Sequence, residues 1–308
     1  MKSLFLIRFT TAIALAFILC LDTFGQAPKT LKLSKILNGK RACVIGNGSV
    51  QFLSQDELVL LTGPEPDCYK NVNNLELVTL STDGRILASK PWPSTFPFVA
   101  LDSRVAIGGS GEVLVLNDRL KTIQTLSLPT GDQSTVSLSK EGTSTLFVTA
   151  PRGETLAYAG SPLTPTRDQK SAAGDQRILS HEDGEMIALK DNKLLTIQSD
   201  GKSKTFADIT WLHDCNRLCQ SWSGGTSYAV SANGERSAFV SSATRFPITD
   251  ESGMFPFWRV LVIDLSSGKE IYRREFDTKT SRRSAQLSPD GKLLLLSDGD
   301  ELQFQSLP

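Results

Sequence analysis

The chain has 308 residues, its 33 Lys and Arg are balanced by 33 Asp and Glu, and apolar residues make up 40% of it. This length allows one or two domains and a sizeable core. Because the charges are interspersed without a basic block, we expect no nucleic-acid partner, since that affinity depends on clustered Lys and Arg.

Residues 1–25 have the layout of a secretory signal peptide. Lys2 and Arg8 form a basic start, an apolar run follows at residues 9–21, and the predicted cleavage lies just before Gln26. An uncleaved membrane anchor is the alternative, but the apolar run is shorter than the ~20 residues that span a bilayer. No later segment is apolar enough to span, so we predict a secreted or periplasmic protein folded over residues 26–308.

The rest of the chain carries strand signals and almost no helix signals. Short alternating or apolar runs rich in Val, Ile, Leu, Thr and Phe are separated by Gly, Asp, Asn, Ser and Pro. No long stretch has apolar residues at helical spacing. The predicted fold class is all-β.

One hairpin phrase recurs along the chain. It reads Gln286–Leu296 near the C-terminus, with partial copies at Ala229–Glu235, Ser137–Thr143 and Ile178–Glu185, each centred on an acidic or amide residue and a glycine. The turn residues of six such hairpins are 39 to 57 residues apart: Asp56, Asp102, Glu141, Asp183, Asn233 and Asp290. A four-stranded propeller blade needs about 40–50 residues. We therefore predict a single β-propeller domain, with six blades fitting best and seven as the alternative.

The two ends of the chain complement each other. The last unit has only three strands, while residues 30–37 alternate well and belong to no hairpin. We expect this N-terminal segment to be the missing outer strand of the last blade, because an open ring would expose two unpaired sheet edges.

The segment from Ser227 to Pro308 resembles the YVTN and TolB-type (WD40-like) β-propeller repeats. The matching pieces are Val230–Gly234, Val260–Lys269 and Leu287–Lys292, although the chain has no Trp-Asp dipeptide. The resemblance implies a propeller scaffold, with functions from protein binding to lactone hydrolysis.

Loop lengths point to one face of the predicted propeller. The four strands of each blade are called a to d in chain order. The turns between strands a and b and between c and d are short, whereas three long connections, at residues 63–74, 207–226 and 243–258, lie on the opposite face. Long loops on a rigid scaffold are common binding sites. The candidate binding residues are the aromatic residues of these loops: Tyr69, Trp211, Trp222, Phe246, Phe255, Phe257 and Trp258. Packing beneath their own loops is the alternative role of these rings.

Four cysteines remain after the signal peptide, and an even number in an exported chain favours disulfides. We predict Cys43–Cys68 and Cys215–Cys219 bonds, with free buried thiols as the alternative. A metal site of Cys215, Cys219 and His213 is a weaker alternative, because zinc sites usually show a second pair of ligands at a definite spacing.

Enzyme motifs are scarce. The chain has no Gly-x-Ser-x-Gly elbow and no phosphate-binding glycine loop. We predict no cofactor and a binding module, expected to be monomeric, for a protein or an envelope or cell-wall ligand. The alternatives are a metal-dependent, lactonase-like hydrolase with its site in the central channel, and a structural component of an envelope assembly.

Overall fold

The computed structural model describes residues 28–43, 50–64, 74–92, 98–109, 111–127, 137–141, 145–149, 155–166, 177–182, 185–198, 201–214, 219–221, 227–231, 233–245, 255–277 and 284–308. The predicted signal peptide lies outside these ranges and stays a prediction. Within them, no helix is long and apolar enough to cross a membrane.

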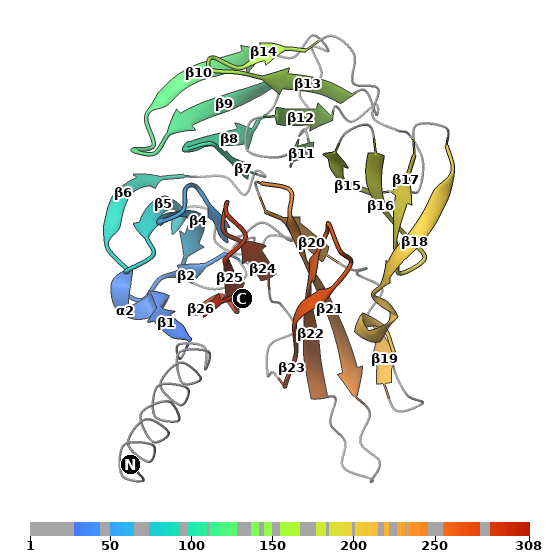
Figure 1. Cartoon of the computed structure of the whole chain (residues 1–308). Helices are drawn as coiled ribbons and strands as arrows, with labels where there is room; N and C mark the ends of the chain where they lie inside the picture. The colour runs from blue at the N-terminus through green and yellow to red at the C-terminus, as the bar shows by residue number, and fades with distance from the viewer. Residues whose placement is uncertain are drawn as a thin grey trace, which may run out of the picture.

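Six antiparallel sheets follow one another along the chain and are set around a common centre (Figure 1). The prediction of a six-bladed, all-β propeller is confirmed. Blade 1 contains β2 (Arg41–Ala42), β3 (Val50–Phe52), β4 (Glu57–Gly63), β5 (Glu76–Ser81) and β6 (Ile86–Pro91). Blade 2 contains β7 (Phe98–Leu101), β8 (Arg104–Gly108), β9 (Glu112–Asn117) and β10 (Thr122–Ser127). Blade 3 contains β11 (Ser137–Glu141), β12 (Thr145–Thr149), β13 (Thr155–Ala159) and β14 (Thr164–Pro165).

The remaining three blades complete the ring. Blade 4 contains β15 (Arg177–Glu182), β16 (Glu185–Lys190), β17 (Lys193–Ile197) and β18 (Ser203–Asp208). Blade 5 contains β19 (Cys219–Ser221), β20 (Ser227–Val230), β21 (Arg236–Arg245), β22 (Phe255–Asp264) and β23 (Glu270–Asp277). Blade 6 contains β24 (Ser284–Leu287), β25 (Leu293–Ser297), β26 (Glu301–Ser306) and the N-terminal strand β1 (Lys29–Lys32). In Figure 1, blade 6 lies between blades 1 and 5.

The N-terminal strand closes the ring, as predicted. β1 pairs antiparallel with β26, so that Lys29 lies opposite Phe304 and Lys32 lies opposite Glu301. It is the outer strand of blade 6, in the sheet order β1-β26-β25-β24. Both chain ends therefore belong to one sheet.

The N-terminal strand is shorter than predicted and ends at Lys32. After Lys32 the chain forms a single helical turn, α2 (Leu33–Ile36), instead of continuing the strand to residue 37. Helical spacing places Leu33 and Leu37 on one side, and both are buried in the cluster between blades 6 and 1. Burial of these two side chains outweighs the alternating pattern of the sequence.

A serine organises the recurring hairpin turn. In blade 6, the Ser288 hydroxyl donates a hydrogen bond to Asp290 Oδ1 (2.7 Å) and accepts one from the Leu293 N–H (2.9 Å). The glycine after Asp290 has a φ of 71°, a conformation that favours glycine. The same arrangement recurs around Ser231 in blade 5 and Ser81 in blade 1. The repeated phrase is thus a hydrogen-bonded turn.

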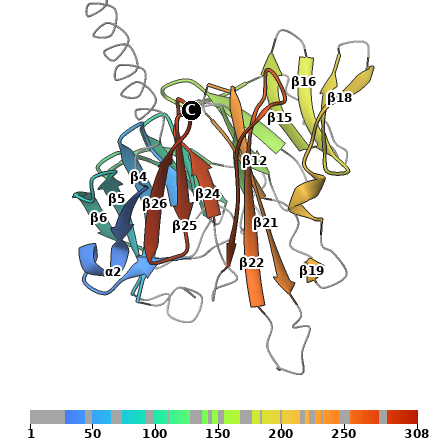
Figure 2. The same cartoon turned by 60° about the horizontal axis from the view of Figure 1, so that its bottom comes forward.

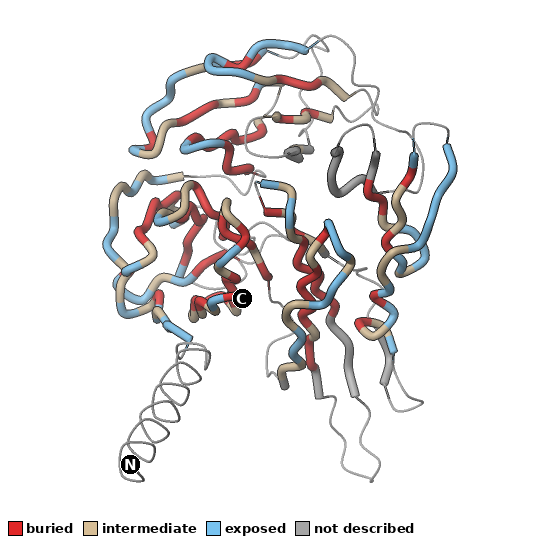
Figure 3. Tube along the Cα trace, in the orientation of Figure 1, coloured by how far each residue is buried: buried red, intermediate tan, exposed pale blue. Residues whose placement is uncertain are grey.

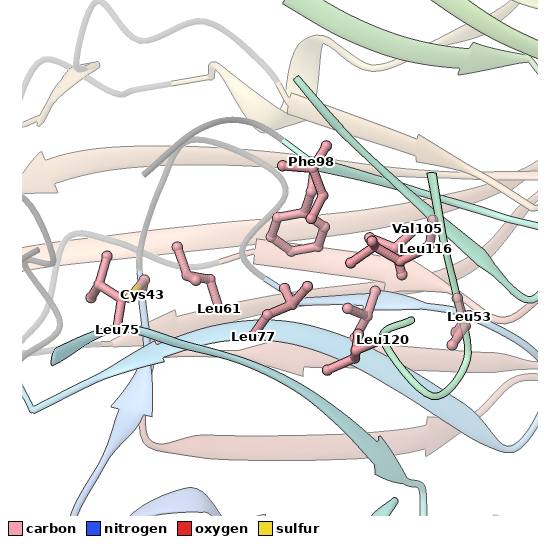
Figure 4. Close-up of a cluster of buried hydrophobic side chains, with 12 residues drawn as sticks. Cys43, Leu53, Leu61, Leu75, Leu77, Phe98, Val105, Leu116 and Leu120 are labelled. Carbon is pink, nitrogen blue, oxygen red and sulfur yellow. The ribbon is translucent and has the colours of Figure 1, made fainter. Parts of the chain in front are cut away.

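Neighbouring blades share apolar cores. Among the described residues, five clusters of buried side chains each join two adjacent blades. Figure 4 shows the cluster in which Leu61 and Leu77 of blade 1 meet Phe98, Val105 and Leu116 of blade 2. Burial is concentrated on the inner and middle strands and falls off along outer strands such as β6 and β10 (Figure 3).

Substitution of Asp300 by Asn tests the ring closure. Burial disfavours the Asp300 charge, but hydrogen bonds from Ser34 and the charges of Arg41 and Lys32 hold the pKa of Asp300 below its usual value. The carboxylate therefore stabilises the fold above about pH 4, and this stabilisation is lost as the pH falls through the lowered folded pKa. We expect Asp300→Asn to lower the free energy of unfolding at pH 7.

Denaturant unfolding of the wild type and the variant between pH 7 and pH 2 measures this effect. The difference between the two proteins should shrink at the acid end. Asp56→Asn, which removes a carboxylate from an exposed turn, is the control. A wild-type-to-variant difference that stays constant over the whole pH range contradicts the assignment.

Candidate functional site

The strand order gives the propeller two different faces. In each blade the a–b and c–d turns lie on one face, and the b–c and d–a connections lie on the other, which we call the loop face. The a–b turn around Asp102 and Ser103 is a tight reversal with both residues at positive φ. Longer connections occur on the loop face, so a site built from loops belongs there.

Two connections on the loop face have the same design. Between blades 6 and 1 the chain forms α2 and then β2, which pairs with the loop-face end of β4 beside β3. Between blades 4 and 5 it forms a 3-10 turn, η4 (Thr210–Leu212), and then β19, which pairs with the end of β21 beside β20. Each short helix is wedged between two blades, and each short strand widens the following blade.

Blade 5 projects beyond the other blades on this face. Its strand β21 has 10 residues, whereas the corresponding strands of the other blades have 5 to 7. Both Figure 1 and Figure 2 show β21 and β22 extending past their neighbours. The prediction of a loop over residues 243–258 is wrong at both ends, because Arg245 pairs with Phe255 and the ladder is continuous down to Arg236 and Asp264. Pairing with β19 on one edge and β23 on the other stabilises this extension.

Trp258 is part of the core. Only 2% of its surface is exposed, and it lies in the cluster between blades 5 and 6. Its ring stacks on Phe276, with centroids 4.6 Å apart. The prediction of Trp258 as an exposed ligand platform does not fit this position, and the alternative of a packing role does.

Phe257 faces the other side of the same strand. It is also only 2% exposed, and the Arg259 guanidinium lies 5.2 Å from its ring centroid. Arg259 also lies over the ring of Trp211 in η4, at 4.9 Å. Of the predicted aromatic residues, the structure thus brings Trp211 and Phe257 together through one arginine.

Arg259 ties η4 to blade 5. Its Nε lies 2.8 Å from Glu275 Oε2 on the neighbouring strand β23, and one terminal nitrogen donates to the carbonyl oxygens of Trp211 (2.6 Å) and Asp214 (2.7 Å). The side chain is 13% exposed. Burial, followed by the nearby Arg259 charge, lowers the pKa of His213. The guanidinium therefore fastens residues 211–214 to β22.

A second arginine lies on the same indole ring. The Arg273 guanidinium carbon is 4.1 Å from the Trp211 ring centroid, and its side chain is 43% exposed. A guanidinium at this distance over an indole is attracted by the ring quadrupole. We name Trp211, Arg259, Arg273 and Glu275 the arginine–tryptophan cluster.

The other predicted site residues are placed as follows. Tyr69, Trp222 and Phe246 lie outside the described residues, as do Cys68 and Cys215. Phe255 begins β22 and Cys219 begins β19, with side chains that are not described. Cys43 is buried directly after β2. Neither predicted disulfide is therefore tested, and both stay predictions.

The charged members of the cluster were not among the candidate residues predicted from the sequence. Arg259 interrupts an apolar run from Phe257 to Ile263, and a charge in such a run signals a paired, partly buried group. Its partner Glu275 follows only from the strand register, in which the two residues lie opposite each other. That register includes a β-bulge near Val262 that the sequence does not announce.

No family model matches the chain, and no curated protein matches it. Solved structures similar to it include the WD40 repeats of RRP9, at 10% identity and a TM-score of 0.47, with 91% of this chain and 100% of that chain covered. The WD40 domain of SCAP from fission yeast has 8% identity and a TM-score of 0.44, with 91% and 98% covered. A chain of the mitotic checkpoint complex has 12% identity and a TM-score of 0.44, with 91% and 94% covered.

The architecture itself is established by the strand order of the six sheets. The resemblance to WD40-like propeller repeats is confirmed at that level. The narrower YVTN or TolB subtype stays a prediction.

Replacing Arg259 by Met should destabilise the protein by about 2 kcal/mol, because Glu275 loses its cation and two carbonyl oxygens lose their donor. The pKa of His213 should rise, since a neighbouring positive charge is removed. Urea unfolding and NMR titration of the two histidines measure these effects.

The double variant Arg259→Met/Glu275→Met is the control, because it removes the unpaired carboxylate as well. It should recover part of the lost stability. A double variant no more stable than the single one, with His213 titrating as in the wild type, contradicts the assigned contacts.

Proposed function

We propose that this protein is an exported β-propeller that binds another protein through the loop face of blades 4 and 5. The observation that carries the proposal is the projecting, fully paired extension of blade 5 with the arginine–tryptophan cluster at its side. Segments that project from a rigid scaffold commonly carry binding sites, which favours a role of this extension in recognition.

The composition of the cluster supports a protein partner. Tryptophan and arginine are the residues most enriched at energetic hot spots of protein interfaces. Trp211 is half-buried and held by Arg259, so little conformational freedom would be lost on binding.

The hydrolase alternative has no comparable support. Within the part of the chain that the structure describes, no group of three or more His, Cys, Asp or Glu residues is placed to hold a metal ion.

A co-purification experiment tests the binding proposal. The tagged full-length protein, expressed in cells that export it, should retain a protein partner that Trp211→Ala loses and Trp211→Phe keeps in part. Ile123→Ala, which shortens a side chain 54% exposed on β10, is the control and should retain the partner. Equal recovery with all four proteins would contradict the proposal, provided that their melting temperatures agree.

Export is part of the same proposal. It is supported by the apolar leader of the sequence and by the complete burial of Cys43. We propose Cys43–Cys68 and Cys215–Cys219 bonds that brace the two connections ending in β2 and β19.

Mass mapping of peptides from the exported protein under non-reducing conditions should find both linked pairs and a mature N-terminus near Gln26. Four free thiols and an intact leader would show that the chain is not processed in this way.

A further inference from the structure

The two arginines of the cluster differ in their hydrogen bonding. The Arg259 guanidinium donates to Glu275 and to two backbone carbonyls. The Arg273 guanidinium carbon lies 4.1 Å from the centroid of the same indole, and among the described residues its hydrogen bonding is limited to one long contact, 3.4 Å to Glu270. Since a guanidinium carries five N–H donors in a fixed plane, most donors of Arg273 have no acceptor within the part of the chain that the structure describes.

We propose that Arg273 is the anchor for an acidic side chain, Asp or Glu, of the protein partner. The inference rests on the proposed function and names the partner chemistry at that site. A guanidinium can donate two parallel hydrogen bonds to a carboxylate and, at the same time, be attracted by an indole ring such as that of Trp211.

The scaffold prearranges this anchor. The Arg259 side chain donates hydrogen bonds to Trp211 O and Asp214 O, and these bonds fix η4 relative to β22. Arg273 itself sits in β23, opposite Leu261, within the paired part of blade 5. The Trp211 ring is therefore in place before a carboxylate binds, so less conformational freedom is lost on binding.

The surrounding charges favour a single carboxylate over a polyanion. The carboxylates of Glu270 and Glu275 each lie beside one of the two arginines. A nucleic acid or an anionic membrane needs several cations in a row without interrupting negative charges. A single carboxylate can reach the Arg273 donors. A polyanion would also have to pass close to the acidic neighbours.

The neighbouring Arg274 provides a matched control. It carries the same charge and is also exposed, but successive strand residues point to opposite sides, and its guanidinium lies over Phe276, at 4.7 Å. Loss of Arg274 therefore changes the net charge equally and leaves the Trp211 side of the sheet intact.

The test uses short random peptides displayed on phage and selected on the full-length exported protein. Selected peptides should contain Asp or Glu, and synthetic copies should bind the wild type at least about tenfold more tightly than they bind Arg273→Gln, the loss expected for one charge-assisted pair. Peptides with Asn or Gln in place of the Asp or Glu should bind the wild type about tenfold more weakly than the acidic peptides do. The same change in the peptide should not weaken its binding to Arg273→Gln. Binding to Arg274→Gln should stay within twofold of the wild type, a difference of about 0.4 kcal/mol.

Several results would overturn the anchor. One is the selection of peptides that lack acidic residues but still need Trp211 for binding. This result contradicts the role of Arg273 and leaves the proposed binding function standing. Another is an equal loss of affinity in Arg273→Gln and Arg274→Gln, which indicates nonspecific attraction. Tighter binding of phosphatidylserine vesicles or duplex DNA than of any peptide overturns it in favour of a polyanion. Absence of any peptide that depends on Trp211 counts against the anchor and the proposed function together.

Discussion

Ring closure depends on the pairing of two short strands from opposite ends of the chain. β1 and β26 align over four residue pairs, and a three-stranded blade 6 would otherwise leave the edge of β26 unpaired. Four pairs are few, so the junction also relies on Leu33, buried between blades 6 and 1, and on Asp300, which accepts two backbone N–H groups. Because each blade contacts only its neighbours, weakening this junction would remove support from blades on both sides.

The blades are held to one another by apolar packing and by single polar side chains that reach the next backbone. The Gln51 amide donates to Phe98 O and accepts from Ala100 N–H in blade 2. Arg104 donates to Gly160 O in blade 3, and Arg236 donates to Gly291 O in blade 6, each at 2.9 Å. These bonds satisfy groups that would be costly to bury unpaired. They also fix the blades relative to one another, so connections on the loop face start and end at defined positions.

Blades diverge toward the rim, and the two helical connections fill the resulting wedges in different ways. Between blades 6 and 1 the filling is apolar, with Leu33 and Leu37 buried. Between blades 4 and 5, Ile209 and Leu212 are buried in the same way, but Trp211 and Arg259 are added to them, next to the half-exposed Arg273. The second filling therefore also places a guanidinium in contact with solvent. This difference is why we place recognition at blades 4 and 5.

Local signals in the sequence predicted the class and the closure of the ring, and they favoured six blades while leaving seven as an alternative. Turn phrases such as that around Ser288 act within a few residues, so their spacing marks each hairpin without knowledge of the rest. The sequence alone also singled out Trp211. Only the tertiary structure decided that Trp258 packs in the core and that Arg259, Arg273 and Glu275 gather around Trp211. Their convergence depends on strand register, a β-bulge and a contact between blades, none of which is encoded over a short stretch of chain.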